Sequence, residues 1–229
     1  MFIGHYAVAF AAKRAAPVAS LGTLFLACEL VDGVWPVFLL LGIERVEIRP
    51  GDTAFTPLAF VHYPWTHSLL MCAAWALALA AAYRLVRPDT RAALAVGAVV
   101  LSHWVLDAIA HRPDLPFAPG GAARIGLGLW NSIPGTLLVE GGMFAAALAL
   151  YLRFTRARDW TGLIALWAFI AFLIAAYLGA AFGPPPPSVT VLAWTGLAGW
   201  LTVPWGYWIE RHRQVVSRHS SLVTSSIQR

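Results

Sequence analysis

Charged residues are scarce in this sequence. Asp, Glu, Lys and Arg make up 12% of the 229 residues and hydrophobic residues 59%, and the mean hydropathy is +0.69. Soluble domains carry about 25% charged residues, so the composition excludes an ordinary soluble protein and indicates an integral membrane protein. The net charge is +5, but the basic residues are scattered between apolar segments, which argues against nucleic acid as a partner.

Cysteine is also nearly absent. The chain has two, Cys28 and Cys72, and both lie inside apolar segments. A thiol in such a segment is usually a small core hydrophobe. The sequence therefore supports neither a disulfide framework nor a cysteine-based zinc site.

Long apolar runs dominate the rest of the chain. We predict an all-α integral membrane protein, a bundle of about six transmembrane helices plus a short N-terminal helix at residues 1–12. The charges of Lys13 and Arg14 follow that short helix, the reverse of the order in a signal peptide, so we expect it to be retained. The predicted spans are 18–43, 64–85, 91–111, 133–154, 160–182 and 189–209.

These spans predict one membrane-embedded domain, residues 1–209, followed by a polar, disordered tail at 210–229. Six spans place 12 of the 16 basic residues on one side, which the positive-inside rule makes cytoplasmic together with the tail. That side receives Lys13, Arg14, Arg84, Arg87, Arg91, Arg153, Arg156, Arg158, Arg211, Arg213, Arg218 and Arg229, and the other receives Arg45, Arg49, Arg112 and Arg124.

A polar stripe marks the end of the third predicted span. His103, Asp107 and His111 are spaced at i, i+4 and i+8, so on a helix they share one face, each about 6 Å above the last. A histidine or carboxylate in apolar surroundings costs several kcal/mol unless it is paired or bound to a metal. The stripe therefore indicates a metal site.

Other ionisable residues of the apolar segments fall at a compatible depth, in the predicted outer half of the bilayer. Imidazole and carboxylate ligands suit zinc, manganese or iron, and an Asp between two His can bridge two ions. Any one of these histidines is more often hydrogen-bonded to a neighbouring helix, but together they favour a metal centre. The predicted metal ligands are His5, Asp32, His67, His103 and Asp107.

Four pieces of the sequence occur in the order of a known family's motifs. They are Gly4-His5, the acidic Asp32, His62-Tyr63-Pro64-Trp65-Thr66-His67-Ser68 and Ser102-His103-Trp104-Val105-Leu106-Asp107. The chain resembles the LexA-regulated, inner-membrane metal-dependent hydrolases of bacteria, whose motifs run GH, PDxD, HRGxTHS and SHxxxD. The resemblance covers about the first half of the chain. The chain departs from this pattern in two places. In the PDxD motif only Asp32 matches, and another acidic residue, Glu29, lies one turn earlier. In the third motif, Tyr63-Pro64 stands where the family has Arg-Gly.

The resemblance implies a metal-dependent hydrolase in the bacterial inner membrane with one or two divalent ions, zinc first, manganese or iron as alternatives. It implies that Asp32, His67, His103 and Asp107 hold one ion, and that His5 helps hold a second with Asp107 as bridge. The ligand order is also similar to that of zinc-dependent phospholipase C and single-strand nucleases, which suggests phosphoester cleavage by analogy.

Three further residues are candidates for the chemistry. His111 and Glu140 are candidates for a further ligand or a general base, and His62 for a role in orienting substrate. For Glu140, a helix-packing role beside Gly141 and Gly142 is an equal alternative.

The leading functional hypothesis is a hydrolase of a membrane lipid or lipid-linked phosphoester, because a site inside the bilayer is most easily reached by a lipid headgroup. The alternative is a metal or proton transporter, since His and Asp stripes also line ion paths. A non-catalytic scaffold with structural histidines is the third interpretation.

Overall fold

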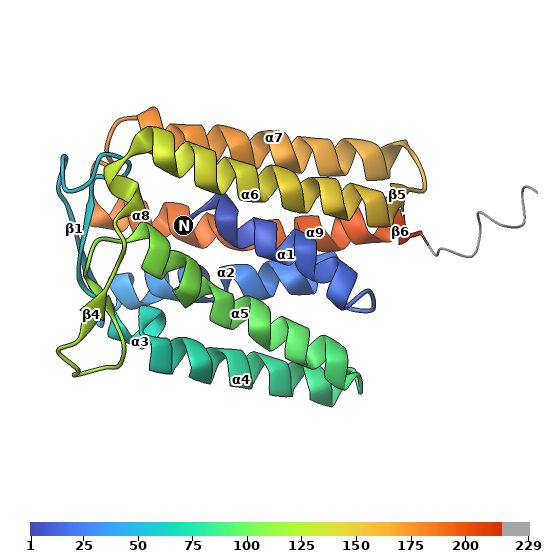
Figure 1. Ribbon diagram of the computed structural model, residues 1–229, viewed down its shortest axis with the longest axis horizontal. Coiled ribbons are helices and arrows are strands. Elements are labelled where there is room, and N and C mark those ends of the chain that lie inside the picture. The colour runs from blue at the N-terminus through green and yellow to red at the C-terminus, as the bar shows by residue number, and fades with distance from the viewer. Residues whose placement is uncertain (217–229) are drawn as a thin grey trace, which may run out of the picture.

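The computed structural model describes residues 1–216 and is an elongated helical bundle (Figure 1). In Figure 1, α4 and α5 run along one edge and α6 and α7 along the other, with α1, α2, α8 and α9 between them. The helices are α1 (Ile3–Ala15), α2 (Leu21–Leu40), α3 (Pro64–His67), α4 (Leu69–Val86), α5 (Thr90–Ala110), α6 (Ile133–Phe154), α7 (Trp160–Phe182), α8 (Val189–Ala198) and α9 (Thr202–Arg211). Two 3-10 turns, η1 (Leu129–Asn131) and η2 (Gly199–Leu201), complete the helical elements.

Serine and aspartate caps set where most long helices begin. The side chains of Ser20, Ser132 and Asp159 each accept a hydrogen bond from a backbone N–H of the first turn of α2, α6 and α7. Such a cap satisfies a donor that the helix itself leaves free. Helices α6 and α7 accordingly match the predicted spans 133–154 and 160–182 residue for residue.

Five helices are long and apolar enough to cross a membrane: α2, α4, α5, α6 and α7. The predicted count of six is not confirmed, because the region 189–209 is split into α8, η2 and α9. Pro204 lacks the N–H that would bond to the carbonyl of Trp200, which favours the tighter 3-10 turn at that point. No single helix of this region therefore has the required length.

The second predicted span, 64–85, is also interrupted. Ser68 is extended, with φ −78° and ψ 151°, and its side chain accepts a hydrogen bond from the backbone N–H of Met71. This cap starts α4 and separates it from the four-residue helix α3, which ends at His67. The break leaves His67 at a helix end rather than inside a continuous span.

Three small antiparallel sheets depart from the all-α prediction. Strand β1 (Arg45–Ile48) pairs with β2 (Leu58–His62) within the predicted loop 44–62, and β3 (Leu115–Pro116) pairs with β4 (Arg124–Ile125) within the loop 112–132. At the other end of the bundle, β5 (Thr155–Ala157) pairs with β6 (Arg213–Val215). These pairs satisfy backbone groups at the two ends of the bundle.

The last sheet corrects the predicted tail over residues 210–216, which belong to the folded bundle. Glu210 and Arg211 belong to α9, and Arg213 is buried, with its guanidinium donating hydrogen bonds to the backbone and side-chain oxygens of Thr155. These long-range contacts order residues 210–216. The remainder of the predicted tail, 217–229, lies outside the described residues.

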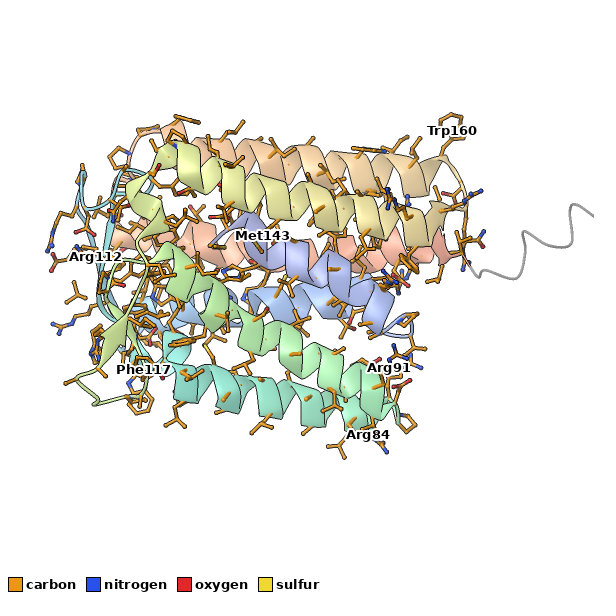
Figure 2. All side chains as sticks on the ribbon, viewed as in Figure 1. Arg84, Arg91, Arg112, Phe117, Met143 and Trp160 are labelled. Atoms are coloured by element: carbon orange, nitrogen blue, oxygen red, sulfur yellow. The ribbon has the colours of Figure 1, made fainter. Side chains whose placement is uncertain are left out.

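The two ends of the bundle differ in charge as the sequence suggested. Figure 2 shows Arg84 and Arg91 at one end and Arg112 at the opposite end, near the β1–β4 loops. The membrane sides on which these ends lie stay a prediction.

An aromatic core joins α1, α2 and α7. The rings of Phe25 and Phe169 stack at 4.8 Å, and Tyr6 and Phe10 meet Phe25 edge-on. Aromatic pairs of this kind contribute about 0.5–1.5 kcal/mol beyond their buried area. This core fixes α1, which carries His5, against the helices that carry the rest of the site.

Candidate metal centre

Helix α5 supplies two residues of the predicted site. His103 and Asp107 lie one turn apart and are almost fully buried, and His103 Nε2 lies 3.2 Å from Asp107 Oδ2. Helix α1 adds His5, whose Nε2 lies 3.3 Å from Asp107 Oδ1. The rings of His5 and His103 stack with centroids 3.8 Å apart. Asp107 therefore lies between two imidazoles, and the Met1 amino group also contacts its Oδ1.

Helices α2 and α3 complete the cluster. His67 Nε2 lies 3.2 Å from Asp32 Oδ1 and 3.8 Å from Asp107 Oδ2, and His103 Nε2 lies 3.6 Å from Asp32 Oδ1. The side chain of Asp32 is 35% exposed, whereas those of the other four are 3% exposed or less. The structure therefore gathers all five predicted ligands, from four helices, and Asp32 is the member on the accessible side.

These residues form two overlapping groups with the geometry to hold a metal ion. One is His5, His103 and Asp107, and the other is Asp32, His67 and His103; in each, the ligand atoms lie within 4.8 Å of one another. Two donors on one tetrahedral zinc ion lie about 3.3 Å apart, because each is about 2.0–2.1 Å from the metal. The separations of 3.2–3.8 Å in the cluster need only small side-chain adjustments to match.

Buried imidazole atoms without hydrogen bonds also fit a metal. Both ring nitrogens of His5 and Nε2 of His103 have no hydrogen-bond partner within residues 1–216, although carboxylate oxygens lie near. Leaving a buried polar atom unsatisfied costs about 1–3 kcal/mol. A cation at the centre of the cluster would accept the lone pairs of His5 Nε2 and His103 Nε2 and balance the charge of Asp32 and Asp107.

Hydrogen bonds at the far side of two rings orient them toward the cluster. His103 Nδ1 lies 3.3 Å from the backbone oxygen of Cys28, so it donates there and leaves Nε2 free to act as a ligand. His67 Nδ1 lies 2.7 Å from Thr66 Oγ1. The first contact selects the tautomer of His103 with an unprotonated Nε2. His67 Nε2 lies within hydrogen-bonding distance of Asp32 Oδ1, at 3.2 Å, and a metal ion bound at Nε2 would replace this hydrogen bond.

Glu44 supports the second of these contacts, and the sequence analysis missed it. It is buried, and its carboxylate accepts hydrogen bonds from the backbone N–H groups of Trp65 (2.7 Å) and Thr66 (2.9 Å) and from Thr66 Oγ1 (2.7 Å). Since the Thr66 hydroxyl has one proton, which goes to Glu44, it must accept from His67 Nδ1–H. The signal that the sequence offered for Glu44 was its place, as an acidic residue directly after the predicted span 18–43.

His111 lies next to the cluster and is fully enclosed. Its Nε2 is 3.9 Å from Asp107 Oδ2, and its Nδ1 is 3.1 Å from Asp114 Oδ1. Tyr63 and Arg112 also donate to Asp114, at 2.8 and 3.0 Å. Burial alone would raise the pKa of Asp114, but the hydrogen bonds from His111, Tyr63 and Arg112 outweigh it and hold that pKa below its ordinary value. The ionised Asp114 orients His111 with Nε2 toward Asp107.

Glu140 and His62 both lie outside the five-residue cluster. Glu140 is buried on α6, and its Oε2 accepts hydrogen bonds from the backbone N–H groups of Phe2 (2.8 Å) and Gly4 (3.2 Å). It therefore anchors the first turn of α1, which carries His5. His62 ends β2 with an exposed side chain, and within residues 1–216 it makes no hydrogen bond or ion pair with the cluster. The structure does not bring His62 to the site.

Residues 3–185 match the model of a family described as YdjM inner membrane protein. No curated protein and no solved structure matches the chain. The family match covers far more than the motif-bearing first half and is consistent with the inner-membrane family that the motifs indicate. This chain belongs to the YdjM inner membrane protein family.

Proposed function

We propose that this protein is a membrane-embedded metal-dependent hydrolase that cleaves a phosphoester of a lipid or lipid-linked substrate with a metal-activated water. The observation that carries the proposal is the cluster of three histidines and two aspartates, four of them buried, in which His5 and His103 have ring nitrogens without a partner among the described residues. A bound divalent ion, zinc first and manganese or iron as alternatives, supplies a water of lowered pKa and polarises the phosphoryl oxygen.

In this proposal, side chains of the protein bind the metal, exchange a proton and position His5. His5, Asp32, His67, His103 and Asp107 bind the ion or ions, and the accessible side of Asp32 admits the substrate. His111, oriented by Asp114, faces Asp107 and is placed to exchange a proton with a group at the cluster. Glu140 keeps His5 in position through the first turn of α1.

A lipid substrate follows from where the cluster lies. Asp32, His103 and Asp107 belong to α2 and α5, two of the helices apolar enough to span a membrane. A water-soluble substrate would have to enter the apolar phase to reach them, whereas a lipid is already there. The positive-inside count predicts that the site faces the outer leaflet.

Metal content and hydrolysis of purified protein test the proposal. We expect one or two divalent ions per chain in the full-length protein in detergent, together with release of the headgroup from a fluorescent phospholipid. His103→Ala should lose both, because both ligand groups share this residue. His212→Ala is the matched control, since His212 lies at the opposite end of the bundle against Asp159 and should lose neither.

Three outcomes would contradict this function. Wild-type protein that binds no divalent ion would exclude a metal centre. Bound metal with metal or proton flux in proteoliposomes, but without phosphoester cleavage, would establish the transporter alternative. Equal loss in His103→Ala and His212→Ala would mean that the substitutions act through folding.

A further inference from the structure

A cavity of about 750 Å³ adjoins the metal cluster. It lies between α2 on one side and α7, α8, η2 and α9 on the other, and residues of the 44–62 loop close one end. Asp32 is part of its wall. Because Asp32 is also the most exposed member of the cluster, this cavity is the route by which a molecule can approach the metal ligands.

The cavity wall is mainly apolar. Phe172 and Leu173 contribute from α7, Leu192 from α8, Trp205 from α9 and Phe60 from β2. Among residues 1–216, only Glu29 and Asp32 contribute charged side chains to the wall. A long apolar chamber with acidic groups at one place suits a ligand with a hydrocarbon part and a polar part, not a wholly polar one.

The arrangement of the helices opens the chamber toward lipid. Within residues 1–216, α7 packs against α9 but not closely against α8. Phe172 of α7 and Leu201 of η2 line the cavity and are 48% and 68% exposed. In a bilayer such exposed apolar side chains face acyl chains, so a lipid chain can enter sideways without crossing water.

We propose that this cavity holds one hydrocarbon chain of a membrane lipid and presents that lipid's phosphoester headgroup to the metal ligands at Asp32. The assignment rests on the proposed hydrolase function and names the substrate as a lipid bound by its chain. The wall runs from Phe60 and Thr56 near the loops to Trp205 deeper in the bundle. A lipid whose headgroup lies near the loops would extend its chain in this direction.

Photo-crosslinking tests chain binding without requiring hydrolysis. The probe is a phospholipid with a diazirine near the end of one acyl chain, added to the full-length protein in detergent. We expect crosslinks to α7 and α8 that a long-chain phospholipid competes away and a short-chain analogue does not. Ala176 lines the cavity, so Ala176→Phe should lower the crosslinking roughly tenfold, because the added ring takes up space that the acyl chain would occupy.

Ala175→Phe is the matched control. Ala175 is the preceding residue of α7, is exposed and does not line the cavity, so this variant should crosslink like wild type. Equal crosslinking in all three proteins, or equal competition by long and short chains, would overturn the inference. Crosslinking that behaves as expected in a protein without hydrolysis would count against the hydrolase function alone. Hydrolysis without any chain-specific crosslinking would count against the cavity alone.

Discussion

Two buried polar clusters in this bundle differ in how completely their atoms are satisfied. Near one end, the ammonium of Lys13 donates to the backbone oxygens of Pro17 (2.9 Å) and Ala19 (2.8 Å) and to Glu210 Oε1 (2.6 Å). The other oxygen of Glu210 accepts from the backbone N–H of Leu21 at 3.1 Å. An ammonium has three protons, and each has an acceptor here.

In the metal cluster, by contrast, several buried polar atoms have no hydrogen-bond partner among the described residues. In the part of the chain that the structure describes, both ring nitrogens of His5 and Nε2 of His103 are buried without a hydrogen bond. Satisfied buried groups serve the fold, since they offset the cost of removing charge from water. Buried ring nitrogens without hydrogen bonds that lie beside the same carboxylate, as His5 Nε2 and His103 Nε2 do beside Asp107, instead indicate a binding site, here for a metal ion. The comparison predicts that the Lys13 cluster governs stability and the His/Asp cluster governs metal binding.

The largest expected effect on folding is at Lys13. Lys13→Ala leaves Glu210 and two backbone oxygens without their partner, and we expect a loss on the order of 3 kcal/mol in the free energy of unfolding. Metal content should stay at the wild-type value. Denaturant unfolding in detergent and elemental analysis measure the two quantities. Arg14→Ala, at the exposed neighbouring residue, is the control. Loss of metal in Lys13→Ala but not in Arg14→Ala would contradict the assignment of the Lys13 cluster to stability alone.

An intermediate effect, on metal affinity, is expected at Glu44. Glu44→Gln replaces an acceptor of the Thr66 hydroxyl by an amide that can donate, which removes the constraint on His67 Nδ1. Loss of such an outer hydrogen bond typically weakens metal binding about 10- to 100-fold. Competition with a chelator of known zinc affinity measures the change.

Glu47→Gln provides the control for Glu44, because Glu47 lies on β1 with its side chain 56% exposed and paired to Arg49. It should bind metal like wild type. If Glu44→Gln lowers the free energy of unfolding but leaves zinc affinity unchanged, Glu44 belongs with the structural cluster and not with the metal centre.

The smallest effect is expected for an exposed ion pair. The hydrogen bond from His212, followed by that from the backbone N–H of Gly162, lowers the pKa of Asp159 below its ordinary value. A lowered pKa stabilises the fold above the unfolded value of about 3.9, and this contribution is lost as pH falls through the folded-state pKa. Asp159→Asn keeps the helix cap, so it should destabilise slightly at pH 7 and not at all well below pH 4.

Unfolding midpoints across pH check this expectation. Asp89→Asn is the comparison variant, because Asp89 caps α5 in the same way but makes no ion pair in the described chain. It should match wild type throughout. A larger effect for Asp159→Asn than for Lys13→Ala would contradict the ranking of buried over exposed pairs.

Local rules predicted what depends on neighbouring residues. The N-caps at Ser132 and Asp159 start α6 and α7 at the first residues of the predicted spans 133–154 and 160–182. The one-turn spacing of His103 and Asp107 predicted their contact, because a helix brings residues i and i+4 together. Local rules failed at Ser68 and at η2, where a side-chain cap and Pro204 interrupt apolar runs that hydropathy alone joins.

The sequence by itself determined that this is a helical membrane protein with His and Asp residues at one depth of its apolar segments. Only the tertiary structure decided which of them share a site. Glu44 meets Thr66, and Glu140 meets the start of α1, across long stretches of chain, whereas the side chain of His62 is exposed. Such contacts depend on how the helices pack, and no spacing along the chain records the direction in which a side chain faces another helix.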